Sequence, residues 1–578
     1  MSINKIPFSF LKFKKIFDFP FVIFLSISFL VIYFLHDHYG ISYDEEVHKN
    51  YGNFILYFYE SFGKNPSALI YRDLFNYGGF FDVLTQSIVH LFSLIGGLEG
   101  IHELRHIVNG WIGLLGYYFL YRIGETIYSR TVGILAVLFL LAIPEYTGHL
   151  FFNPKDIPFS SFYLGALYFF FRFFRENENP RKWFVLFVVF TGLAIGIRIL
   201  GILLWPIFIL GIGIKLYNRK GLSVSTFRNW IISSVCFLLG SYFVTVLFWP
   251  FLLRKPTAGL IQVFKTMSSF PWNGTVLTAG KDIIAPEIGR AYLPIFFSYT
   301  LPDWFFLLLI VSIAAVGWYV WKLFKNKGNL EGRKKYSFFL SSETFLLAAA
   351  GFGALLIIFV KKPVLYNGYR QVFFLIPPII LVLTAISWEF LNRFPKKTIS
   401  AICILFFLLL LDTWVIMVRM HPYEYVYFNR TFAGGMKKGS ELFDVEYWAT
   451  SLKEGSLWLK EDLKNDPKQV KVASCASAQQ TDYYLNPKEY LESERGFINF
   501  ARSINLKNLF SEENFHTITR FEMYVHSGKQ KFQYEGTLQN ADYLLTTRLY
   551  HIPERFSGEI VHTVERMGIP ILYVMKKK

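Results

Sequence analysis

Long apolar runs separated by short hydrophilic breaks dominate the first 420 residues of the chain. A helix needs about 20 predominantly apolar residues to cross a bilayer. Runs of about this length predict eleven spans, at residues 19–35, 104–124, 131–147, 158–174, 183–198, 199–217, 230–250, 304–321, 343–360, 371–391 and 399–418. The pattern therefore predicts a mainly α-helical, polytopic membrane protein.

Residues 80–98 are also apolar, but polar positions interrupt them. Asp82, Gln86 and His90 recur at helical spacing, which is typical of a helix that lies in the membrane interface. Counting this run as a span would also place most of the later basic clusters on the outer side. We therefore predict an interfacial or re-entrant helix here.

The pattern changes after residue 418. A helical stretch around 440–464 is followed by the strand-like runs Val470–Ala473, Ala541–Thr546 and Ile569–Met575,. This change predicts two domains. Residues 1–418 form a transmembrane domain with outer loops at 36–103 and 251–303, and residues 419–578 form a soluble α/β domain.

The distribution of charge gives an orientation and excludes one class of function. The chain is 53% hydrophobic and 17% charged, with a net charge of +17. Residues 419–578 hold 22 Lys+Arg and 20 Asp+Glu, so residues 1–418 carry the remaining +15. Basic residues in short loops mark the cytoplasmic side, which predicts a cytoplasmic N-terminus and a C-terminal domain on the outer side of the membrane. Because topology accounts for the basic excess, we expect no nucleic-acid partner.

An acidic cluster follows the first predicted span. Ser42 and Glu45 have the spacing of a capping box, and acids suit the first turn of a helix; this structural interpretation accounts for Glu45 well. Asp44 is not needed for the box, and it shares a helix face with His48,. We expect Asp44 to be catalytic, with Glu45 as a second catalytic candidate and His48 as a substrate-binding residue.

A second acidic site follows the third predicted span. Asn153 can cap a helix that has Pro154 at its first position and Asp156 in its first turn,. Two outer helix starts, each with an aspartate at the same depth, can also converge on one pocket. We therefore expect Asp156 to be catalytic and Asn153 and His149 to bind substrate.

Several cations stand on the predicted outer face, where the distribution of basic residues disfavours them. Arg198 lies between the fifth and sixth spans, and Lys361, Lys362 and Arg370 flank the loop before the tenth. Anionic lipid headgroups are one explanation. A substrate phosphate is the other, since arginine offers planar, bidentate donors. We expect Arg370, Arg198 and Lys155 to bind a donor phosphate.

These motifs resemble those of the GT-C glycosyltransferases that use polyprenyl-phosphate sugars, such as the protein O-mannosyltransferases and the lipid A aminoarabinose transferases. The resemblance extends over about residues 15–460. It is carried by Tyr43-Asp-Glu-Glu-Val-His48, Asn153-Pro-Lys-Asp156, Asn367-Gly-Tyr-Arg-Gln371 with Pro377-Pro378, His421-Pro-Tyr-Glu-Tyr-Val-Tyr-Phe-Asn429 with Gly434-Gly435, and Asp444-Val-Glu-Tyr-Trp448.

The resemblance implies a hexosyl- or pentosyltransferase with residues 1–418 as its catalytic domain, in a bacterial inner membrane with residues 419–578 in the periplasm. It implies that Asp44 is the catalytic base, that Asp156 is the acid of the second loop, and that Arg370 contacts the donor phosphate. Gln371 departs from the pattern, because relatives often carry histidine there. The implied partners are a polyprenyl-phosphate sugar, membrane lipids, and a glycan, lipid or protein acceptor. We expect no cofactor, while a divalent ion at Asp44 and Asp156 stays open.

Two other functions compete with this interpretation. A transporter or flippase of a lipid-linked intermediate is expected to carry charges deep within its spans, whereas these acids stand at the outer ends of spans. A scaffold whose outer domain binds partners would leave both acidic motifs unexplained.

Overall fold

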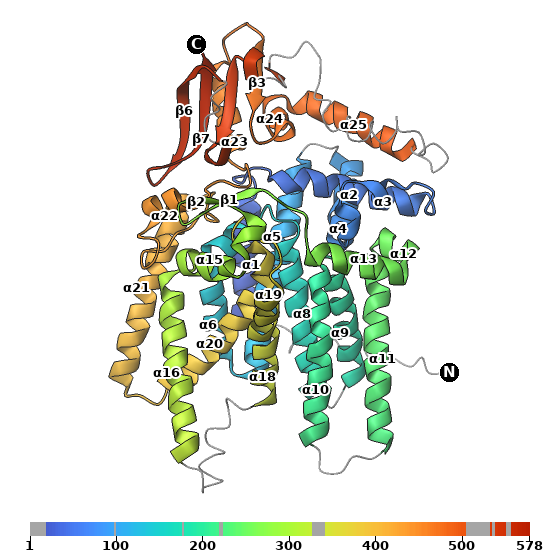
Figure 1. The fold of residues 1–578 in the computed structure, drawn as a ribbon, viewed down its shortest axis with the longest axis vertical. Helices are drawn as coiled ribbons and strands as arrows, with labels where there is room; N and C mark the ends of the chain where they lie inside the picture. The colour runs from blue at the N-terminus through green and yellow to red at the C-terminus, as the bar shows by residue number, and fades with distance from the viewer. Residues whose placement is uncertain are drawn as a thin grey trace, which may run out of the picture.

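The structure, a computed structural model, is a bundle of helices with a sheet-containing region at one end (Figure 1). It describes residues 19–96, 100–175, 179–218, 224–325, 341–503, 532–534, 538–550 and 556–578.

Seven helical segments of the described residues are long and apolar enough to cross a membrane. They are α8 (Asp156–Arg175), η3–α10 (Ile199–Asn218), α11 (Val224–Val246), α16 (Asp303–Lys325), α18–η6–α19 (Ser342–Lys361), η7–α20 (Arg370–Leu391) and α21 (Lys396–Met420). The other four predicted spans fall on shorter or less apolar helices, which are α1 (Phe19–Leu35), α5 (Ile101–Ile127), α6 (Arg130–Leu141) and α9 (Pro180–Ile195). The mainly helical membrane fold is thus confirmed.

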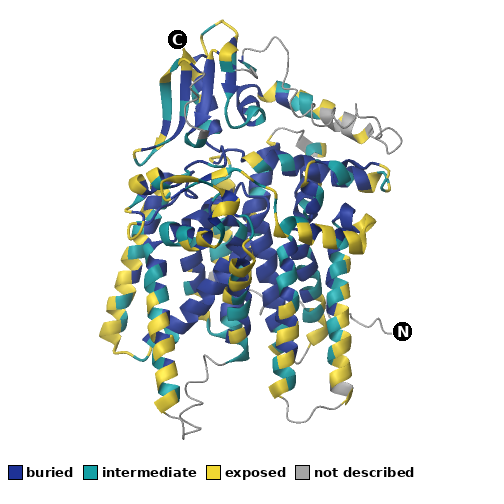
Figure 2. Ribbon diagram, viewed as in Figure 1, coloured by how far each residue is buried: buried dark blue, intermediate teal, exposed yellow. Residues whose placement is uncertain are grey.

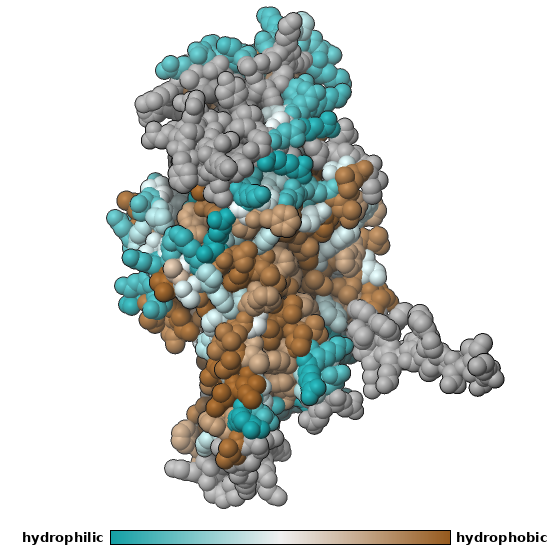
Figure 3. Space-filling view, turned by 90° about the vertical axis from the view of Figure 1, so that its right-hand side faces the viewer, coloured by the Kyte–Doolittle hydropathy of each residue, from teal (hydrophilic) through white to brown (hydrophobic). Residues whose placement is uncertain are grey.

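The segments differ in how far the protein itself covers them. Most of α8 and η7–α20 is buried inside the molecule, at 83% and 89% of their apolar windows, whereas α11 and α21 are only 17% and 22% buried. Figure 2 shows this as a buried centre surrounded by exposed outer helices. The exposed surface of the helical part is largely hydrophobic on the face shown in Figure 3, as lipid contact requires,.

The segment between α1 and α5 lies across the end of the bundle (Figure 1). It holds α2 (Tyr43–Glu60), α3 (Ser67–Ile70), η2 (Leu74–Asn76) and α4 (Phe80–Gly96). Asp82 and Gln86, from the polar stripe of α4, are buried because they meet His48 of α2 and Arg105 of α5.

A second irregular segment joins α11 to α16. It contains α12 (Pro250–Arg254), α13 (Pro256–Ser268), the hairpin β1 (Thr275–Thr278) and β2 (Lys281–Ile284), α14 (Ala285–Ile288), η4 (Gly289–Ala291) and α15 (Tyr292–Thr300). In Figure 1 the hairpin lies between the bundle and the C-terminal sheet.

The C-terminal region has the α/β character that its sequence predicts. Its sheet has the order β4-β3-β5-β7-β6, from β3 (Val470–Ser474), β4 (Phe532–Tyr534), β5 (Tyr543–Thr547), β6 (Gly558–Arg566) and β7 (Ile569–Lys577). The helices and turns are α22 (Met436–Leu442), α23 (Leu452–Asp462), α24 (Ala478–Leu485), α25 (Pro487–Ser503), η9 (Leu538–Asn540) and η10 (Arg548–Tyr550). Figure 1 shows α25 extending from the sheet across α2.

Candidate functional site

A cavity of about 560 Å³ lies where α2, the start of α8, η3 and η7 meet. Its walls also include residues 267–272 of the α11–α16 segment and residues 447–448 of the C-terminal region. Three groups of side chains line it: carboxylates, cations and aromatic rings. These are Asp44 and Asp73; Arg72, Lys155, Arg198 and Arg370; and Tyr43, Tyr77, Phe270, Trp272, Tyr366, Tyr447 and Trp448.

Local capping chemistry sets the start of α2. Ser42 and Glu45 form the predicted capping box, with the Ser42 N–H donating to Glu45 Oε2 at 2.6 Å. Glu45 is further held by His106, whose Nε2 lies 2.9 Å from Oε1. Asp44 takes no part in the box, and its side chain stays 38% exposed at the cavity wall. Its carboxylate is therefore accessible to a molecule in the cavity.

The start of α8 is also capped as predicted, but its aspartate is enclosed. Asn153 Oδ1 accepts hydrogen bonds from the backbone N–H groups of Lys155 and Asp156, at 3.1 and 2.8 Å. Its Nδ2 donates to Asp156 Oδ2 at 3.0 Å. The Asp156 side chain is only 2% exposed and does not line the cavity.

Two arginines bind Asp156 and present their charge to the cavity. Arg198 Nη2 lies 2.5 Å from Asp156 Oδ1, and Arg370 Nη1 lies 3.1 Å from Oδ2. The same Arg370 nitrogen is 3.9 Å from Asp44 Oδ2. Arg370 thus stands between the two aspartates, and both lie within ion-pair distance of one guanidinium. The two helix starts are also linked directly, since Ser42 Oγ donates to the Phe152 carbonyl at 2.8 Å.

A tight turn delivers Arg370 to this position. Asn367 and Gly368 both have positive φ, at 56° and 71°, which asparagine and glycine tolerate best. A Cβ at Gly368 would lie 2.0 Å from Glu145 Oε1, so a larger residue there would displace the Glu145 carboxylate. Glu145 also accepts the backbone N–H of Tyr369 at 3.1 Å. The buried carboxylate of α7 (Pro144–Gly148) therefore anchors the turn just before Arg370.

Lys155 is the third cation at the cavity wall with a buried acidic partner. Its Nζ lies 3.9 Å from Asp82 Oδ2 and 4.5 Å from the centre of the Tyr77 ring. His48 holds the other oxygen of Asp82 at 3.2 Å. Burial lowers the pKa of Lys155 to about 8, and Asp82 offsets this only in part. The ammonium is therefore still mostly protonated at pH 7, and it releases its proton far more easily than an ordinary lysine.

His149 and Asn153 lie behind the cavity wall rather than in it. Both side chains are fully buried, and Asn153 Nδ2 lies 2.8 Å from His149 Nδ1. Burial and Arg370 lower the pKa of His149 to about 3, so its ring is neutral at pH 7 and Nδ1 can accept from the Asn153 amide,. Of the residues predicted to bind substrate, His48 alone lines the cavity.

Aromatic rings form another part of the cavity wall. Trp272 stacks on Tyr366 with 4.2 Å between ring centres, and the Arg370 guanidinium lies 4.6 Å from the Trp448 ring. Trp448 stands in one of the motifs that carry the family resemblance, and the Asn367-Gly368 turn signal lies next to Tyr366,. Flat aromatic faces beside polar groups suit sugar rings and the planar faces of arginine.

Within the part of the chain that the structure describes, no group of three or more His, Cys, Asp or Glu side chains is arranged to hold a metal ion. Asp44 and Asp156 instead share an arginine.

A comparison with protein families matches residues 90–253 to the model of the dolichyl-phosphate-mannose-protein mannosyltransferases. The matched region contains Asp156 and Arg198, and it confirms the resemblance to glycosyltransferases that use polyprenyl-phosphate sugars. No curated protein matches the chain.

Several solved structures match most of this chain at low identity. ArnT from Cupriavidus metallidurans is 14% identical with a TM-score of 0.45, over 96% of this chain and 98% of that one. The oligosaccharyltransferase of Archaeoglobus fulgidus is 10% identical with a TM-score of 0.45, over 93% and 70%. The arabinofuranosyltransferase AftD from Mycobacteria is 13% identical with a TM-score of 0.40, over 96% and 40%. At these scores the likenesses assign no residue role to this chain.

Proposed function

We propose that this chain is a glycosyltransferase that moves a sugar from a polyprenyl-phosphate donor to a hydroxyl group of a glycan, lipid or protein acceptor. The family match over residues 90–253 supports the reaction class. The sugar is a hexose or pentose, and Asp44 is the base.

One observation carries the proposal. A partly exposed carboxylate, Asp44, lines the same cavity as Arg370, Arg198 and Lys155. Transfer from a sugar phosphate needs one group to take a proton from the acceptor and others to hold the departing phosphate. The cavity supplies both kinds of group within one wall.

The chemistry is a single displacement. The acceptor oxygen attacks the anomeric carbon as the bond from that carbon to the phosphate oxygen breaks. The hydroxyl proton passes to Asp44, and the negative charge that develops on the polyprenyl phosphate is stabilised by Arg370, Arg198 and Lys155. Attack from the face opposite the phosphate inverts the configuration at the anomeric carbon.

We assign different roles to the remaining predicted residues. Asp156 acts through the two arginines that it binds, and Asn153 and His149 act through Asp156, so all three are positioning residues. Glu45 makes the contacts of a helix cap, and we propose that it acts through this cap rather than as a catalytic group. His48 is proposed to act by holding Asp82, the partner of Lys155, at the cavity wall.

The proposed location is a bacterial inner membrane, with the N-terminus in the cytoplasm and residues 419–578 in the periplasm. The charge distribution along residues 1–418 supports this orientation,. Apolar residues at the cavity wall, among them Ile199, Leu200 and Ile358, suit a donor whose hydrocarbon tail stays in the lipid.

Mass spectrometry of surface glycans and lipids from a strain that lacks this chain tests the proposal. We expect one sugar to be missing from one acceptor, and complementation with Asp44→Asn to leave it missing. An unchanged set of glycans would overturn the proposal. Accumulation of a lipid-linked sugar on the cytoplasmic face, cured by Asp44→Asn as well as by the unaltered chain, would instead indicate a flippase.

A further inference from the structure

The C-terminal region contacts the N-terminal end of α2, the helix that carries Asp44. The backbone N–H of Ile41 donates to the Tyr484 hydroxyl at 2.8 Å, and the N–H of Tyr43 donates to the Trp448 carbonyl at 2.9 Å. At Gly40 a Cβ would lie 1.9 Å from the Thr450 carbonyl oxygen, so these two segments of the chain are in direct backbone contact. Residues more than 400 positions away in the sequence thus hold the segment that leads into α2.

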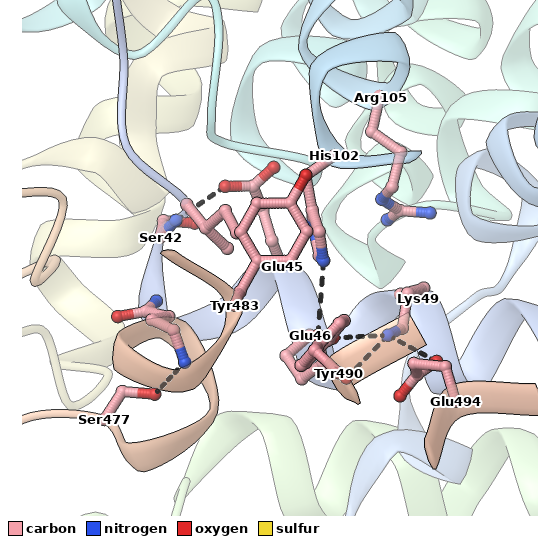
Figure 4. Close-up of polar contacts among 12 residues, drawn as sticks. Ser42, Glu45, Glu46, Lys49, His102, Arg105, Ser477, Tyr483, Tyr490 and Glu494 are labelled. Carbon is pink, nitrogen blue, oxygen red and sulfur yellow. Dashed lines mark hydrogen bonds and ion pairs between the residues drawn. The ribbon is translucent and has the colours of Figure 1, made fainter. Parts of the chain in front are cut away.

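A buried ionic network makes a second contact on the same helix. Lys49 of α2 has no exposed surface, and its Nζ lies 2.7 Å from Glu46 Oε1 and 2.7 Å from Glu494 Oε2 of α25. It also donates to the Tyr490 hydroxyl at 3.0 Å, which in turn donates to Glu46 Oε2 at 2.8 Å. Figure 4 shows these side chains converging from α2 and α25, with His102 of α5 beside Glu46.

The charges of this network are mutually dependent. Burial opposes the ionised form of Glu46, but Lys49 and then His102 outweigh it and hold the pKa of Glu46 well below its usual range. Burial likewise opposes the charge on Lys49, and Glu46 and Glu494 together raise its pKa. Removing Glu494 therefore leaves a buried ammonium with one carboxylate instead of two.

Buried ion pairs of this kind contribute little net stability, because desolvation offsets the attraction, and their best-attested use is to select one register between two elements. Here the two elements are α25 and α2, and Asp44 lies little more than one helical turn before Lys49,. A helix moves as a unit, so the register of α25 on α2 also fixes the Asp44 carboxylate relative to Arg370.

We propose that Glu494 and Tyr490 of α25, with Tyr484 of α24, are positioning residues for the transfer reaction, and that the C-terminal region holds the catalytic carboxylate in place through them. The inference rests on the proposed function in one respect only, which is the role of Asp44. It differs from a C-terminal region that merely recruits the acceptor, because such a region needs no fixed register on α2.

The test uses the full chain and three variants of α25. Glu494→Gln removes the charge with little change in shape, Tyr490→Phe removes one hydroxyl, and Glu494→Asp restores the carboxylate. Glu492→Gln is the matched control, because Glu492 is exposed on the same helix two residues away. The measurements are amide hydrogen exchange over residues 41–60, restoration of the missing surface sugar in the deletion strain, and binding of undecaprenyl phosphate alone.

We expect amides at the start of α2 to exchange about tenfold faster in Glu494→Gln and Tyr490→Phe than in Glu492→Gln, since exchange reports local opening. Sugar transfer should fall about tenfold, because small displacements of a reacting group are costly. Glu494→Asp should recover most of it, and undecaprenyl phosphate should bind all variants within about twofold.

Wild-type exchange over α2 in both Glu494→Gln and Tyr490→Phe overturns the inference, and so does faster exchange with undiminished transfer. Loss of transfer with unchanged exchange assigns α25 to acceptor recruitment instead. If the unaltered chain restores no sugar but the α25 variants still speed amide exchange in α2, the proposed function fails. The docking of α25 on α2 is then supported without it.

Discussion

The starts of α2 and α8 look alike in sequence and differ in the folded chain. Each is a capped helix N-terminus with an aspartate in or next to its first turn. Asp44 is 38% exposed on the cavity wall, and its nearest cation, Arg370, is 3.9 Å away. Asp156 is 2% exposed, and two arginines and an amide surround it.

The difference separates two uses of one residue type. A carboxylate that can reach a molecule in the cavity can accept a proton from it. A carboxylate already paired with two guanidinium groups has little capacity left for a substrate, and it serves better to neutralise and orient those groups. The same cap chemistry therefore supports a candidate base in one helix and an anchor for the two arginines proposed to bind phosphate in the other.

Asp44→Asn should have the largest effect on transfer. Loss of a general base lowers turnover by about 10²–10⁴-fold, and the partly exposed site should keep the melting midpoint nearly unchanged. Turnover of the donor identified in the deletion strain, measured in proteoliposomes, checks this. Asp73→Asn, at another part of the cavity wall, is the control and should retain most activity. An equal loss of turnover in Asp44→Asn and Asp73→Asn would mean that Asp44 has no special role as a base.

Asp156→Asn should differ from Asp44→Asn in the kind of effect. It should lower folding stability and raise the donor KM, whereas Asp44→Asn lowers turnover. Arg198 and Arg370 would lose their shared buried partner, which costs about 3–5 kcal/mol of folding stability. The donor KM should rise by about tenfold or more as the guanidinium groups lose their orientation. A thermal melt and donor kinetics check this. A fall in kcat at unchanged KM and unchanged melting would mean that Asp156 itself reacts.

Lys155 should make donor binding depend on pH, because it can lose its charge near neutral pH whereas an arginine cannot. With a pKa of about 8, it is charged below that pH and neutral above it. The donor KM should therefore be lowest at neutral pH and rise several-fold as the pH passes through about 8 toward 9.5. Lys155→Arg, which stays charged over this range, should flatten the rise. A rise that persists in Lys155→Arg would assign the titration to another group.

Glu45→Gln should have the smallest effect, although Glu45 is next to Asp44 in the chain. Glutamine keeps an oxygen for the Ser42 N–H but loses the charge opposite His106. The expected change is a loss of about 1 kcal/mol in stability and a kcat within about twofold of wild type. Calorimetry and the same turnover assay check this. A hundredfold fall in kcat would make Glu45 a catalytic residue after all.

Local spacing was sufficient to predict much of this structure. The membrane helices follow from the length of apolar runs, and the three predicted strands of the C-terminal region fall on β3, β5 and β7. The capping box of Ser42 and Glu45 and the capping bonds of Asn153 are contacts within three residues, so the order of residue types is enough to predict them,.

Contacts across the chain could not be predicted in the same way. The polar stripe of α4 predicted an interfacial helix but did not indicate that Asp82 binds His48 and Lys155, which α2 and the loop before α8 bring to it. Nothing near Lys49 in sequence indicates that Glu494 is its partner.

The order of apolar and polar residues thus established the helices, their caps and the set of charged residues at their outer ends, since each of these depends on neighbours within one or two turns. Only the tertiary structure decided what surrounds Asp44 and Asp156. Arg198, Arg370 and the aromatic wall come from separate segments that meet at the cavity. A carboxylate's chemistry depends on which cations and how much water reach it, and three-dimensional packing sets both.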